Sequence, residues 1–185
     1  MYLSAELLTN NDQKVLYFSP LSTLGKKIET AKKTYMISSD LNSPNVTINS
    51  DITSLPFLQE QFDIIICSHV LEHVKDELAA LNELYRVLNQ NGTCIVLIPQ
   101  NREFSATYEN PEIETFAQKE AAFGQGDHVR WYGDDIRERF EPIGFDVSVL
   151  DYLNKIDSAI ISRFELRESD EWTHDRTLIF QLVKL

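Results

Sequence analysis

The chain has few of the residues that mark several large protein classes. Its 185 residues include only two cysteines, Cys67 and Cys94, and both fall in runs that predict buried strands. Two buried thiols are typical of a reduced core and indicate a cytoplasmic protein rather than a disulfide-stapled secreted one. No stretch approaches the roughly 18 apolar residues of a membrane span, and the first residues lack the layout of a signal peptide. We therefore expect no membrane association.

Basic residues are also scarce. Lys and Arg number 17 against 29 Asp and Glu, which gives a net charge of −12. This balance argues against binding the phosphate backbone of a nucleic acid, and it suits a small or neutral ligand better. The length predicts a single domain over residues 1–185 with a sizeable core. Nothing in the sequence indicates the oligomeric state.

Strand and helix patterns alternate along most of the chain, which predicts a doubly wound α/β fold. Asn91-Gly92 has the composition of a helix C-terminal cap, and Gly144 is expected to end a later helix. The segment 153–175 has no functional interpretation. Predicted strands cover 14–19, 34–38, 46–49, 64–68, 93–98, 145–152 and 177–185, and predicted helices cover 22–33, 76–88 and 134–143.

Residues 62–74 are the most informative stretch for function. The apolar run Ile64–Ser68 suits a strand buried on both faces. It ends in three polar residues, His69, Glu72 and His73. Ligands bind at the carboxyl edge of open α/β sheets, so these side chains predict a site there.

The same three residues spell His-x-x-Glu-His, the inverted zinc-peptidase signature. That signature requires a long helix and a third ligand further along the chain. Here the buried strand ends only at Ser68, which leaves His69 at or before any helix start. We therefore favour a ligand pocket over a peptidase and expect no metal.

Two motifs together resemble class I S-adenosylmethionine-dependent methyltransferases, most closely the ubiquinone/menaquinone-biosynthesis group. They are Phe62–His73 and the run Leu84-Tyr85-Arg86-Val87-Leu88 followed by Asn91-Gly92-Thr93. The resemblance covers about residues 14–152 and the last strand. It implies a Rossmann-like sheet of seven strands, mostly parallel with an antiparallel C-terminal strand. It also implies S-adenosyl-L-methionine as cofactor and methyl transfer to a small-molecule or sugar-like acceptor.

The resemblance also implies the cofactor-binding residues. Asp40 matches the residue that accepts hydrogen bonds from the ribose hydroxyls, and Asp51 matches one that faces the adenine amine while Ile52 packs on the ring. The alternative for both aspartates is an Asx-turn. The remaining expected cofactor contacts are Phe18, Ser19, Pro20, Leu41, Ser68 and His69.

One feature departs from the family. Residues 17–23 contain no glycine, whereas such enzymes carry a glycine-rich turn after the first strand. Side chains there narrow the space for a cofactor and restrict φ to negative values. The alternative function is therefore a non-catalytic methyltransferase-like binding domain.

The connection formed by residues 101–131 is far longer than usual, which predicts a lid or binding loop. His128, like His69, is a candidate base for an acceptor hydroxyl. Arg130 and Tyr132 are candidates for substrate binding. The alternative is that these side chains only anchor the loop to the domain.

Overall fold

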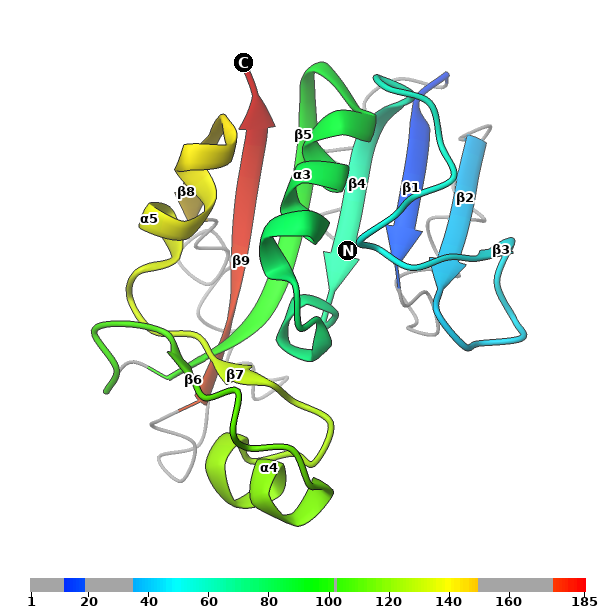
Figure 1. Ribbon diagram of the computed structural model, residues 1–185. Coiled ribbons are helices and arrows are strands. Elements are labelled where there is room, and N and C mark those ends of the chain that lie inside the picture. The colour runs from blue at the N-terminus through cyan, green and yellow to red at the C-terminus, as the bar shows by residue number, and fades with distance from the viewer. Residues whose placement is uncertain (1–11, 19–34, 102, 150–174) are drawn as a thin grey trace, which may run out of the picture.

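The structure, a computed structural model, describes residues 12–18, 35–101, 103–149 and 175–185. One sheet has the strand order β3-β2-β1-β4-β5-β9-β8 (Figure 1). All neighbouring strands are parallel except β9, which runs antiparallel to both β5 and β8. The predicted seven-stranded, mostly parallel sheet is confirmed. Its strands are β1 (Lys14–Phe18), β2 (Tyr35–Asp40), β3 (Ile48–Asn49), β4 (Phe62–Ser68), β5 (Leu88–Asn101), β8 (Phe145–Val149) and β9 (Asp175–Lys184).

Two of the described helices, α3 (Glu77–Val87) and α5 (Ile136–Phe140), lie in front of the sheet in Figure 1. Short 3₁₀ turns, η1 (Leu71–His73) and η2 (Glu141–Ile143), accompany them. The helix predicted over 22–33 lies outside the described residues. Among the described helices, none has the length and hydropathy needed to cross a bilayer.

The central strands are buried on both faces, as the isoleucine run predicts. Leu16 and Ile65 belong to the main core that α3 and α5 cover. Their neighbours Val15 and Ile64 belong to a second cluster. All four are at most 2% exposed, so the strands β1 and β4 pack on both sides, as parallel strands in α/β proteins do.

Helix α3 begins as its sequence indicates but ends earlier. The side chain of Asp76 accepts a hydrogen bond from the Ala79 amide at 2.9 Å and caps the first turn. The helix stops at Val87, and Leu88 already has extended φ and ψ angles. The cap predicted at Asn91-Gly92 was therefore wrong.

Asn91-Gly92 instead turns the chain inside the first part of β5. Asn91 has φ +60°, which an asparagine tolerates better than most residues. A Cβ at position 92 would lie 2.8 Å from the Asn89 carbonyl oxygen, so only glycine fits there. Asn-Gly is a turn signal in either setting, and the local sequence does not say whether the helix has already ended.

The long connection has secondary structure of its own. It contains the strand β6 (Tyr108–Glu109), the helix α4 (Phe116–Phe123) and the strand β7 (Arg130–Trp131). β6 and β7 pair antiparallel and bring the two ends of the segment together. The connection is thus a small subdomain below the sheet in Figure 1, and not an irregular loop.

Gly144 ends η2 with φ +114°, as predicted for a helix stop. A Cβ there would also meet the Tyr85 ring at 3.0 Å. We expect Gly144→Ala to lower the free energy of unfolding by about 1–3 kcal/mol, because the residue is held in a strained backbone region. Urea unfolding measures the change. Asp146→Ala, an exposed position two residues on, is the control, and an equal effect in both variants would contradict the argument.

Candidate functional site

A cavity of about 720 Å³ opens at the carboxyl ends of β1, β2, β3 and β4. Six of the predicted cofactor residues line it: Phe18, Asp40, Leu41, Asp51, Ile52 and His69. Ser68 ends β4 beside them but is not part of the lining, and Ser19 and Pro20 lie outside the described residues. The strand ends meet because Phe18 is in register with both Ser39 and Cys67 in the flanking strands.

Asp40 uses one carboxylate oxygen to shape its own loop. Its Oδ1 accepts hydrogen bonds from the Asn42 and Ser43 amides at 2.8 and 2.7 Å. This is the Asx-turn that the sequence offers as the alternative. Oδ2 has no hydrogen bond among the described residues, so one acceptor oxygen remains for a ligand at the cavity edge.

Asp51 is arranged in the same way. Its Oδ1 accepts from the amide and the hydroxyl of Thr53 at 2.9 and 2.7 Å. These hydrogen bonds hold the pKa of Asp51 below its usual value. The carboxylate is therefore ionised at neutral pH and acts only as an acceptor, while the neighbouring Ile52 is buried.

His69 sits at the turn where the chain leaves β4. It has φ +52°, an uncommon conformation for a residue other than glycine. Its Nδ1 lies 3.0 Å from Oε1 of Glu72, whose side chain is buried. A buried carboxylate that holds one nitrogen of a half-exposed imidazole orients the ring, as in general-base pairs.

His128 does not line the cavity. It is 3% exposed and lies behind His73, with the two rings edge to face at 4.8 Å. Burial, and secondarily His73, lowers the pKa of His128, so its imidazole is neutral at pH 7. The structure thus separates the two predicted bases, His69 at the cavity and His128 behind it.

Arg130 is 2% exposed and is engaged by the protein. Its Nη1 donates to the carbonyls of Leu71 and Val74, both at 2.6 Å, and its Nη2 donates to that of Lys75 at 3.1 Å. Nε donates to Glu109 at 3.1 Å. Four hydrogen bonds engage most of the five N–H groups of a guanidinium, and this geometry favours the anchoring alternative.

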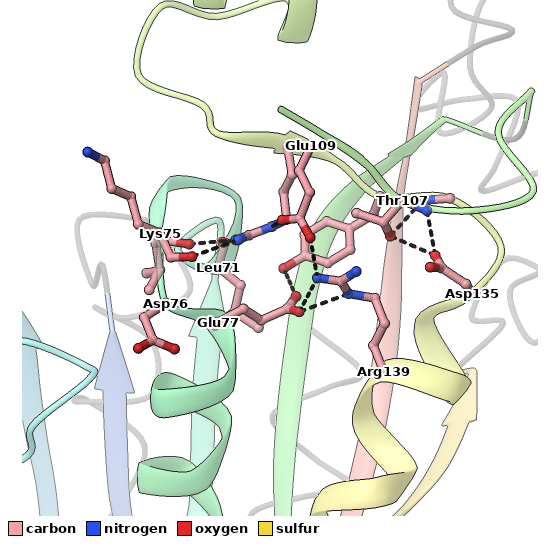
Figure 2. Close-up of polar contacts among 12 residues, drawn as sticks. Leu71, Lys75, Asp76, Glu77, Thr107, Glu109, Asp135 and Arg139 are labelled. Atoms are coloured by element: carbon pink, nitrogen blue, oxygen red, sulfur yellow. Dashed lines mark hydrogen bonds and ion pairs between the residues drawn. The ribbon is translucent and has the colours of Figure 1, made fainter. Parts of the chain in front are cut away.

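The Tyr132 side chain is also buried and hydrogen-bonded within the protein. Its hydroxyl donates to Oε1 of Glu77 at 2.5 Å, and Arg139 donates to Oε2 of the same carboxylate. Arg139 also contacts Glu109, which joins this group to Arg130 (Figure 2). Glu77, Arg139 and Glu109 were not predicted from the sequence, because their pairing joins segments 30 to 62 residues apart.

The subdomain packs on the carboxyl ends of β4 and β5. The Val129 amide donates to the Glu72 carbonyl at 2.9 Å, and Asn101 and Tyr132 pair through a backbone hydrogen bond of the same length. A second cavity of about 670 Å³ lies beside it, lined in part by Glu109, Lys119 and Arg130. Lys75 lines both cavities.

Comparisons with known proteins agree with this geometry. Residues 23–96 match the family described as Methyltransferase domain. A crystal structure of an S-adenosylmethionine-dependent methyltransferase from Mesorhizobium loti superposes with a TM-score of 0.68 at 13% identity, over 99% of this chain and 96% of that one. The chain has the class I methyltransferase fold. YcgJ from Bacillus subtilis gives a TM-score of 0.66 at 16% identity, with 99% and 96% coverage.

Sequence similarity to curated relatives is confined to part of the methyltransferase fold. A demethylmenaquinone methyltransferase of Mycobacterium sp. strain KMS is 37% identical over 65 residues, 34% of this chain and 28% of that protein. The matched segments span between 22% and 34% of the curated relatives' lengths. The family match includes both motifs that carry the resemblance, which is confirmed, and it begins at Thr23, the last residue of the glycine-free turn.

We expect Arg130→Met to lower the free energy of unfolding by about 3–5 kcal/mol, because buried carbonyls left without a donor cost about 1–3 kcal/mol each. Arg137→Met is the matched control. Arg137 is exposed, and among the residues that the structure describes its side chain pairs only with Glu141, at 3.4 Å, so its loss should stay within about 0.5 kcal/mol. Urea unfolding of both variants makes the comparison. Similar losses for the two would rule out the anchoring role of Arg130.

Proposed function

We propose that the protein is an S-adenosyl-L-methionine-dependent methyltransferase acting on a small-molecule acceptor. The observation that carries the proposal is the cavity at the strand ends. It is lined by Asp40 and Asp51, each of which accepts the hydrogen bonds of its own turn through Oδ1, and by the buried Ile52. This is a concave site with a few convergent polar groups, the usual form of a cofactor pocket. The match to the methyltransferase domain supports the same chemistry.

The residues present fit this cofactor. The second oxygen of Asp40 is suited to accept from the ribose hydroxyls, since charged acceptors make the stronger hydrogen bonds. Asp51 is suited to accept from the adenine amine, with Ile52 against the ring. Phe18 and Leu41 add apolar surface to the same cavity. When bound, the cofactor supplies an electrophilic methyl group on sulfur.

Methyl transfer is an in-line displacement, so positioning accounts for much of the rate. His69 is the proposed base for an acceptor hydroxyl. In the tautomer in which Nδ1 donates to Glu72, Nε2 is the basic nitrogen. His128 is a weaker candidate because it is buried and does not line the cavity.

The acceptor is proposed to enter from the second cavity, because Lys75 borders both cavities. Similarity to an enzyme named for demethylmenaquinone supports a small-molecule acceptor over a macromolecule.

The two cysteines are free and buried, which supports the proposal of a reducing compartment such as the cytoplasm. A lid movement of residues 101–131 stays a prediction, and it would have to break the contacts of Arg130.

Titration calorimetry with S-adenosylhomocysteine and S-adenosylmethionine tests the proposal. We expect one site per chain and a rise in thermal stability with ligand concentration. If millimolar ligand gives neither heat nor thermal shift, the glycine-free turn does not admit the cofactor. The non-catalytic binding domain would then replace the enzyme.

Asp40→Asn isolates the ligand contact from the turn. The amide oxygen still accepts from the Asn42 and Ser43 amides, whereas the charge and the second acceptor are lost. We expect S-adenosylhomocysteine to bind more weakly by about 1.5–3 kcal/mol, the range for a hydrogen bond to a charged group. Asp146→Asn, on the exposed face of β8, is the control. An unchanged affinity in folded Asp40→Asn would remove Asp40 from the site.

A further inference from the structure

Three side chains that bind metals in other proteins come together beside the cavity. Glu72 and His73 lie on η1, and His128 lies two residues before β7. One ligand atom from each lies within 4.8 Å of the others. The sequence offered His69, Glu72 and His73 as a motif and gave no reason to add His128, which is 55 residues beyond His73.

Two of these side chains end in buried atoms without a partner. Among the described residues, Oε2 of Glu72 and Nδ1 of His128 have no hydrogen bond. Glu72 is 0% exposed and His128 is 3% exposed. Buried polar atoms are nearly always paired, so two orphaned acceptors in one cluster require an explanation.

In Glu72 and His73 the other side-chain atom is already held, as outer-shell partners hold metal ligands. Glu72 Oε1 contacts His69 Nδ1 at 3.0 Å. In His128 the unpartnered ring atom is Nδ1, which is therefore available to an ion. His73 Nδ1 lies 3.3 Å from the Asp127 carbonyl oxygen. These contacts leave Glu72 Oε2, His128 Nδ1 and His73 Nε2 as the ligand atoms.

We propose that Glu72, His73 and His128 bind a divalent transition-metal ion of the zinc type. Two imidazole nitrogens and one carboxylate oxygen are a common zinc ligand set, and three protein ligands leave the fourth tetrahedral position open. Ligand atoms around such an ion lie about 3.3 Å apart. The widest spacing in the cluster therefore has to contract by roughly 1.5 Å, and His73, the partly exposed member, is the residue with room to move.

His73 lines the methyl-transfer cavity, so an ion held by these three side chains would lie at the edge of that cavity. An oxygen of the acceptor bound there would be acidified by the ion, with His69 alongside to take its proton. This catalytic role rests on the proposed methyltransferase function, whereas binding of the ion does not. The site differs from a peptidase centre, since η1 is a three-residue turn and not a long helix.

Metal binding is tested on chelator-treated protein titrated with zinc chloride and, separately, with cobalt chloride. We expect one ion per chain, and visible cobalt absorption bands of a tetrahedral site. Glu72→Gln and His73→Ala should each weaken zinc binding at least 100-fold, since even outer-shell changes cost 10–100-fold. Glu112→Gln, an exposed carboxylate elsewhere in the subdomain, should leave the affinity unchanged.

His73→Ala decides the outcome if Glu72→Gln fails to fold, because His73 is only partly buried. Equal zinc affinity in His73→Ala and the parent protein, or no stoichiometric ion in the parent, would overturn the proposal. S-adenosylhomocysteine is titrated into the same samples. Zinc binding without S-adenosylhomocysteine binding would contradict the proposed function and leave the metal site standing, and the reverse result would do the opposite.

Discussion

The buried guanidinium of Arg130 fixes the segment on which the candidate site depends. It donates hydrogen bonds to three carbonyl groups just after β4, those of Leu71, Val74 and Lys75. The segment contains only the three-residue 3₁₀ turn η1, so most of its backbone carbonyls need partners from elsewhere in the protein. Glu72 and His73 project from this turn, and His69 contacts Glu72. One arginine from a distant strand thus determines where the polar groups at the end of β4 lie.

The sequence predicted the sheet and the cavity edge well, because both follow from local pattern. Three consecutive isoleucines indicate a strand buried on both faces, and Ile64 and Ile65 do pack into opposite clusters. The carboxyl ends of parallel strands meet at one edge. Asp40 and Asp51, which end or follow two such strands, therefore border one cavity. For each aspartate the Asx-turn and the proposed cofactor contact are compatible, because one carboxylate oxygen can accept within the turn while the other is left for a ligand.

The long-range side-chain contacts and the subdomain between β5 and α5 could not be predicted from local sequence patterns. The roles of Arg130 and Tyr132 depend on carbonyls and a carboxylate more than 50 residues away. The burial of Glu77 is likewise invisible, since an acidic residue in a first helical turn normally suggests only a favourable dipole contact. The polar subdomain between β5 and α5 has weak periodicity, so its strands and helix were missed. Sequence spacing records which residues share a face, and not which distant groups pair across the fold.

The position of β9 has a consequence for synthesis. This strand lies between β5 and β8 although it follows both of them in the sequence (Figure 1). Until residues 175–184 leave the ribosome, β8 lacks its partner strand and one edge of β5 stays open. Unpaired strand edges recruit other chains, so these two edges are exposed to misassembly until β9 has been synthesised and has paired with both strands.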